Sequence, residues 1–169
     1  FLNDNKQSSL EYYLKGINLL EFSEISLAKS NLNNICNLAG DFGISSETRQ
    51  IIKRLKEKRR ELAQSANPTI IQAHVCDALS AIYQDILHNE RGAIAYLRGR
   101  VNVTEKLNLE RELAKAWLDL GLVNEEFENF NTALDANNSA LQIIEQKNLK
   151  DLLGIALYNT ANIYTKITE

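Results

Sequence analysis

The sequence contains no methionine, one proline, one tryptophan and seven glycines, so few positions interrupt regular backbone structure. An all-β fold needs frequent turn residues, and their scarcity predicts helix through nearly the whole chain. No run of about 18 consecutive apolar residues occurs, which excludes a membrane-spanning helix within this sequence. Only two cysteines are present, Cys36 and Cys76, in separate helical patterns. That number and spacing exclude a disulfide framework and a zinc ligand set, so we expect two small core residues.

The remaining composition is typical of a soluble globular domain. Apolar residues make up 44% and charged residues 24% of the chain, and the net charge of −3 argues against general nucleic-acid binding. The chain opens on Phe1 and stops at Glu169, directly after an apolar helical pattern. We therefore expect a fragment of a longer protein, with nothing in it that indicates a membrane. The compartment stays open, with the cytoplasm favoured over the periplasm.

One stretch, residues 116 to 141, organises the rest of the chain. Its first half matches the pattern W-x₂-L-G-x₂-Y at three of its four positions, and its second half places small residues at the alanine positions of A-x₃-F-x₂-A. The residues that carry these matches are Trp117, Leu120, Gly121, Ala133 and Ala140, with Asn124 in the tyrosine position. The stretch resembles a tetratricopeptide repeat, in which Trp117 is expected to pack between helix pairs and not to contact a ligand. The resemblance implies an all-α fold of antiparallel helix pairs, stacked into a right-handed superhelix, or α-solenoid.

The pattern recurs along the chain at an unusual interval. Cys76 to Trp117 is 41 residues and Trp117 to Leu157 is 40, against roughly 34 in the common repeat. In the repeat that contains Cys76, the residue at the alanine position of the second helix, Ala93, falls one residue later than the pattern requires. We therefore expect a longer turn between His88 and Arg91. The whole chain is interpreted as one domain with a degenerate repeat at 9–41, an irregular basic helix at 47–66, repeats at 68–107 and 109–147, and an unpaired helix at 150–168.

Three local signals predict where helices begin and end. Gly40 is the expected C-cap of the second helix. Ser45 or Ser46 can cap the basic helix by accepting a hydrogen bond from a first-turn N–H. Asn67 followed by Pro68 is a strong helix start, because proline in the first turn forfeits no hydrogen bond.

The resemblance also suggests a function. Periods of this size are common in tetratricopeptide-like sensor domains of bacterial signalling proteins, including those fused to GGDEF-type diguanylate cyclases and histidine kinases. We therefore expect a non-catalytic module that binds a protein or peptide and controls an output domain beyond Glu169. The alternative is a structural scaffold or assembly adaptor that uses the same surface and forms a homodimer through the C-terminal helix.

In such arrays the ligand lies along the first helix of each repeat. Carrying those positions over gives a mixed and mildly acidic groove, in which Asp77 and Asp119 oppose the acidic chaperone tails that some family members bind. An apolar and amide-lined groove for a peptide or helix remains open. The predicted groove residues are His74, Asp77, Gln84, Lys115, Leu118, Asp119, Leu122, Tyr158, Asn159 and Asn162.

The segment KRLKEKRR concentrates positive charge on one predicted helix. Six basic residues and one acidic residue give it +5, so the other residues of this −3 chain carry −8. The basic residues are Lys53, Arg54, Lys56, Lys58, Arg59 and Arg60. An anionic partner, a phosphate-rich ligand or a membrane surface would each suit them. The competing interpretation is a solvated face paired locally with Glu57 and Glu61, since no interleaved aromatic residue offers base stacking.

No motif supports catalysis, a metal or a cofactor. Asp41, Phe42 and Gly43 spell DFG, but no glycine-rich loop or H-R-D motif accompanies them. His74 and His88 are well separated in the sequence, with no H-E-x-x-H motif and no carboxylate at ligand spacing. We therefore expect this fragment not to be an enzyme.

Overall fold

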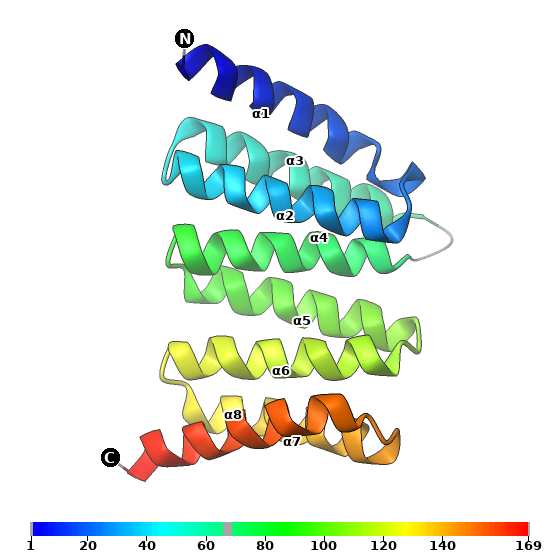
Figure 1. Ribbon diagram of the computed structural model, residues 1–169, viewed down its shortest axis with the longest axis vertical. Coiled ribbons are helices and arrows are strands. Elements are labelled where there is room, and N and C mark those ends of the chain that lie inside the picture. The colour runs from blue at the N-terminus through cyan, green and yellow to red at the C-terminus, as the bar shows by residue number, and fades with distance from the viewer. Residues whose placement is uncertain (1, 66–68, 169) are drawn as a thin grey trace. The chain divides into compact units, whose positions relative to one another are not determined.

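Figure 1 shows a computed structural model, which describes residues 2–65 and 69–168. The described residues form eight α-helices with two short non-α turns and no strand, which confirms the all-α prediction. None of these helices is long and apolar enough to cross a bilayer. The elements are α1 (Leu2–Asn18), η1 (Leu20–Phe22), α2 (Ile25–Phe42), α3 (Ser46–Ala63), α4 (Ile70–Ala81), η2 (Ile82–Ile86), α5 (Glu90–Lys106), α6 (Glu110–Glu126), α7 (Phe130–Gln146) and α8 (Lys150–Thr168).

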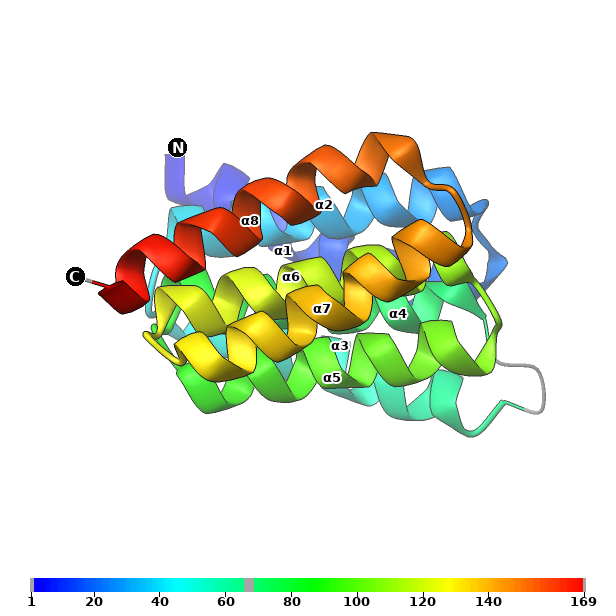
Figure 2. The same ribbon diagram turned by 90° about the horizontal axis from the view of Figure 1, so that it is seen from below.

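The helices belong to two compact units, Phe1–Ala93 and Ile94–Glu169, and α5 crosses from one to the other. In the first unit α2 contacts α1, α3 and α4, and its most extensive contact is with α4. In the second unit α7 packs along both α6 and α8, and α8 also touches α6 (Figure 2). The right-handed superhelix expected from the resemblance stays a prediction.

The turn between α2 and α3 shows that one predicted helix cap is wrong and which of two serines forms another. α2 continues past Gly40 and ends at Phe42, because Gly43 takes a positive φ of 58° and its N–H donates to Ala39 O at 3.0 Å. Ser45, rather than Ser46, caps α3: its Oγ accepts from Thr48 N at 3.2 Å. The predicted start at Asn67 and Pro68 lies outside the described residues.

The turns between the later helices follow a regular interval that the sequence motifs do not reveal. Within the described ranges, the non-glycine residues with positive φ are evenly spaced: His88, Asn108, Glu128 and Asn148. Each is the second residue after the end of a helix and allows the chain to reverse. Two such intervals equal the 40 residues that separate Trp117 from Leu157 in the sequence.

The one-residue offset near Ala93 arises inside a helix and not in a longer turn. η2 is a single π-helical turn in which Leu87 N–H donates to Ile82 O at 3.2 Å, five positions back. A π turn contains one residue more than an α turn, so positions before it are displaced by one. This explains why the interval from Cys76 to Trp117 is longer by one than the next interval while the turns stay evenly spaced. It also corrects the expected extension at His88 to Arg91.

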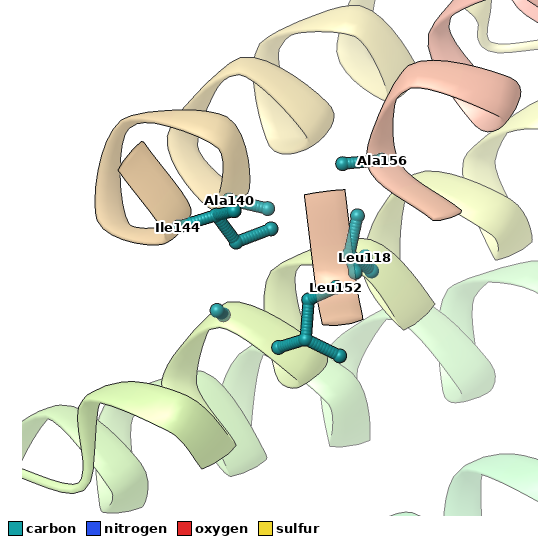
Figure 3. Packing of buried hydrophobic residues seen from close by; sticks show 6 residues of the cluster. Leu118, Ala140, Ile144, Leu152 and Ala156 are labelled. Atoms are coloured by element: carbon teal, nitrogen blue, oxygen red, sulfur yellow. The ribbon is translucent and has the colours of Figure 1, made fainter. Parts of the chain in front are cut away.

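The core of the second unit is built from small and branched side chains on three helices. Leu118 of α6, Ala140 and Ile144 of α7, and Leu152 and Ala156 of α8 face one another (Figure 3). Trp117 is half-buried and packs against this cluster, as expected for a packing residue. The alanines leave room for the backbones to approach while the larger side chains fill the space between them.

Gly121 is required by a side chain on α7. A Cβ added to Gly121 would lie 2.6 Å from Asn137 Oδ1, well inside van der Waals contact. The Asn137 side chain is 0% exposed, and neither of its amide atoms has a hydrogen-bond partner among the described residues. The motif glycine therefore accommodates a buried amide that contributes little hydrogen bonding in return.

We predict that the effect of Gly121→Ala on the free energy of unfolding changes sign with the residue at position 137. In the unmodified chain the clash should lower the free energy of unfolding by about 1–2 kcal/mol. In an Asn137→Ala background the same substitution should be neutral or raise stability by up to about 1 kcal/mol, because alanine favours helix over glycine. Urea unfolding of the four variants measures this, and additive effects would contradict the proposed contact.

Candidate functional site

A groove runs between α2 and α4 in the first unit. Its first part is a hollow of about 360 Å³, and its second part, of about 450 Å³, shares Cys36, Asn37 and Ala81 with the first. We refer to both parts together as the α2–α4 groove. Its lining comprises Lys29, Leu32, Asn33, Cys36, Asn37, Gly40 and Asp41 from α2, His74, Asp77, Ala78 and Ala81 from α4, and Ile82, Asp85 and Ile86 from η2.

Both walls of the α2–α4 groove arise from helical spacing. On α2 the residues that face the groove recur every three or four positions, so they form one stripe along the helix. Early residues of α2 share the first hollow with early residues of α4, and late residues share the second, so the two helices run in the same direction. Two parallel helices therefore frame a channel whose buried lining residues are mostly apolar and whose exposed lining residues are mostly polar.

The charges along the α2–α4 groove are unevenly placed. Lys29 and Asp77 lie in the first hollow, whereas Asp41 and Asp85 lie in the second. Three carboxylates and one ammonium give the lining a charge of −2 with its histidine neutral. The carboxamides of Asn33 and Asn37, one helical turn apart on α2, lie between the two ends of the groove and offer both hydrogen-bond donors and acceptors.

Cys36 lies at the middle of the groove as a neutral thiol. Its Sγ–H donates to Ala78 O at 3.6 Å across the two helices. Burial, reinforced by the charges of Asp77 and Asp85, raises the pKa of the Cys36 thiol to about 12. The thiolate is the reactive form, so this cysteine has the character of a packing residue and not of a nucleophile.

We predict that Cys36 reacts with iodoacetamide only slowly in the folded chain at pH 8. An ordinary thiol with a pKa near 8.5 is partly ionised there, whereas a raised pKa leaves almost no thiolate. Mass spectrometry of the labelled chain at pH 8 and in urea measures the difference. Equal labelling of Cys36 in both conditions would show that its environment is open and its pKa ordinary.

Two of the predicted groove residues line the α2–α4 groove. His74, which is largely buried, and Asp77 face the first hollow, whereas Gln84 is half-buried in η2 outside the lining. Sequence reasoning missed Asn33 and Asn37, because α2 was interpreted as the second helix of a repeat and such helices were not expected to face the ligand. Their spacing of four on the same side of the helix was the available signal.

The predicted residues in the second unit divide between interior and surface. Leu118 and Asn159 are each 4% exposed: Leu118 belongs to the core, and Nδ2 of Asn159 has no partner among the described residues. Leu122 and Tyr158 are exposed, and Asn162 is half-buried. Two charged members are engaged within the unit: Lys115 pairs with Glu112 Oε1 at 2.8 Å, and Asp119 pairs with Arg100.

The basic residues of α3 are of two kinds: some contact other residues of the first unit, and others line an open groove. Lys58 is only 1% exposed, and its Nζ donates to Asn18 O at 2.9 Å and pairs with Glu21 Oε1 at 3.0 Å. It thereby neutralises the carbonyl end of α1 and holds that end against α3. Arg54 donates to Asn18 Oδ1 and pairs with Glu61 at 2.9 Å, which is the local pairing expected from the sequence. For Lys58, in contrast, the interpretation as part of a solvated face is wrong.

The other half of the predicted basic patch lines a second groove. Lys53, Lys56 and Arg60 border a hollow of about 500 Å³, and Arg59 is half-buried elsewhere on α3. We refer to this hollow as the α3–η2 groove, lined by Arg49, Ile52, Lys53, Lys56, Glu57 and Arg60 from α3, Tyr83 from η2, and Leu87 just after it. Arg49 was absent from the predicted patch, because the charge run in the sequence begins only at Lys53.

We predict that alanine substitutions of two lysines of α3 differ strongly in their effect on stability. Lys58→Ala removes a buried ammonium that bonds Asn18 O and should lower the free energy of unfolding by about 2–3 kcal/mol. Lys53→Ala alters an exposed side chain and should change it by less than about 0.5 kcal/mol. Thermal or urea denaturation compares the two variants. Similar stabilities would place Lys58 at the surface.

The described residues contain no group of three or more His, Cys, Asp and Glu side chains placed to hold a metal ion. The polar groups instead lie along two open grooves. Open, elongated hollows of this kind suit a polymeric ligand such as a peptide, whereas small-molecule sites are usually more enclosed.

Comparison with known proteins gives a fold and not a family. No family model matches the sequence, and no curated protein sequence matches it. Among solved structures, the crystal structure of BtubC (BKLC) from P. vanneervenii is similar, with a TM-score of 0.70 and 11% sequence identity. The match covers 98% of this chain and 67% of that chain. At this identity the likeness concerns the helical fold alone.

Proposed function

We propose that this chain is a tetratricopeptide-like interaction module whose α2–α4 groove holds an extended peptide segment of a protein partner. The observation that carries the proposal is the open polar channel between two parallel helices, with Asn33 and Asn37 along one wall. A carboxamide can donate to a peptide carbonyl and accept from a peptide N–H at once. Two amides one turn apart therefore provide binding that depends on the peptide backbone and tolerates varied sequences.

The arrangement of helices supports the tetratricopeptide-like part of the proposal. Contacts of α1 with α3 and of α2 with α4 in the first unit, and of α6 with α8 in the second, bring next-but-one helices together in each unit. In this interpretation α2, α4, α6 and α8 are the first helices of successive repeats, and α1 completes an earlier one. The degenerate repeat proposed at 9–41 would then be replaced by the pair α2 and α3.

The charge of the groove restricts which peptides would fit. Asp41 and Asp85 stand at one end, where a lysine or arginine of the peptide would be favoured. Lys29 at the other end would favour an acidic side chain or a carboxylate. A peptide with opposite charges toward its two ends therefore complements the channel better than a uniformly acidic one.

The test is a selection from a random peptide display library on the 169-residue chain, followed by affinity measurement of the enriched peptides. Asn33→Ala combined with Asn37→Ala removes hydrogen bonds worth about 1 kcal/mol each and should weaken binding roughly 20–30-fold. The matched control is Asn102→Ala with Asn138→Ala, because both asparagines are exposed in helices and neither lines the groove.

An absence of enriched peptides, or an equal loss in the control, would contradict the proposal. So would enriched peptides that lack a basic residue and bind the Asn33 and Asn37 variant as tightly as the unmodified chain. Circular dichroism of each variant separates lost binding from lost folding.

The regulatory role is a further part of the proposal. The long repeat period favours a sensory module that transmits peptide binding to an output domain, such as a diguanylate cyclase. A structural scaffold is the second candidate, and exposed apolar side chains on α8, including Ile155, Tyr158 and Tyr164, favour it as a surface for assembly or homodimer formation. Sensing requires that the peptide alter an output activity, whereas a scaffold binds without altering one.

A further inference from the structure

The α3–η2 groove has one wall made of a regular cationic stripe. Arg49, Lys53, Lys56 and Arg60 all line the groove and stand at positions i, i+4, i+7 and i+11 of α3. This spacing places the four side chains on a single face of the helix. At a rise of 1.5 Å per residue the stripe extends about 16 Å, which equals three helical turns.

The opposite wall is apolar and rigidly supported. Tyr83 and Leu87 provide it, and Ile52 of α3 adds a buried apolar side chain to the lining. A Cβ added to Gly92 would lie 1.8 Å from Tyr83 Cδ1, so the Tyr83 ring rests directly on the glycine backbone. The Lys56 ammonium lies over the same ring, 5.3 Å from its centroid. The π turn of η2 and a glycine thus fix an aromatic side chain beside the cationic stripe.

The charge of this groove is strongly positive within an acidic chain. Four cations and Glu57 give a lining charge of +3, and Glu57 is itself paired with Arg54 at 3.2 Å. The α2–α4 groove carries −2, although both grooves use residues of η2. The two grooves therefore favour ligands of opposite charge.

We propose that the α3–η2 groove docks an acidic amphipathic helix of a partner protein. Carboxylates at i, i+4, i+7 and i+11 of such a helix would meet the four cations, and apolar side chains on its adjacent face would contact Tyr83 and Leu87. This interaction is separate from peptide binding in the α2–α4 groove and does not depend on it.

A helix fits these observations better than a nucleic acid does. Single-stranded nucleic acids need an open aromatic face for base stacking, whereas the Tyr83 ring contacts Gly92 and Lys56. The cations also form one wall only, while the facing wall is apolar. A ligand with one acidic face and one apolar face complements both walls at once.

The test uses a fluorescein-labelled peptide of about 15 residues, a length at which an isolated helix can form. It carries glutamates at positions 2, 6, 9 and 13 and leucines on the adjacent face. Fluorescence anisotropy with the full chain gives its affinity. Lys53→Glu with Arg60→Glu, both exposed residues of the groove, should weaken binding at least about tenfold, because each reversal replaces attraction by repulsion.

The control is Lys106→Glu with Lys150→Glu, which makes the same change in net charge at exposed residues that line neither groove. Its affinity should stay within about twofold of the unmodified chain, since exposed charges outside the groove lining are largely screened at about 0.15 M salt. Equal weakening by both variants would overturn the proposal and indicate unspecific attraction.

Two further probes need no protein variant. A peptide that keeps the four glutamates but replaces the leucines with serine should bind at least about tenfold more weakly, because it loses the apolar contacts. A single-stranded oligonucleotide of equal charge should also bind more weakly than the leucine peptide. Equal or tighter binding of either probe, or no binding of the leucine peptide, would overturn the proposal.

Discussion

The constraint on which the structure depends is that no helix of this chain can bury its apolar stripe alone. α6, α7 and α8 share one cluster of alanine, leucine and isoleucine side chains, so each helix needs the other two to exclude water. The helices that meet in this cluster have similar lengths and reverse at regular intervals. The evenly spaced left-handed residues His88, Asn108, Glu128 and Asn148 provide that regularity.

The π turn of η2 is the point at which this regularity is adjusted, and both grooves include residues from it. Ile82, Asp85 and Ile86 face the α2–α4 groove, whereas Tyr83 and neighbouring Leu87 face the α3–η2 groove. One turn of helix therefore contributes an acidic side chain to one surface and an aromatic side chain to another. π turns occur often at functional sites, and this one separates two surfaces of opposite charge.

Helical content and the bounds of α3 and α8 to within a few positions were predictable, because they depend on side-chain periodicity along a single helix. The packing role of Trp117 was also correctly predicted. The grooves were less predictable. His74 lines a groove as expected, but Asn33 and Arg49 were missed, because their roles depend on helices that are distant in the sequence. Leu118 was predicted to face a ligand, yet α7 and α8 cover it.

The sequence by itself determined that this chain is all-helical and how its charge is segregated along the chain, since both depend on local spacing and composition. Only the tertiary structure decided which charged residues are available to a partner. Lys53 and Lys58 belong to the same basic run, yet Lys58 is buried against Asn18 and Glu21 while Lys53 borders an open groove. Their difference arises because α1 packs on one face of α3 and leaves another face open.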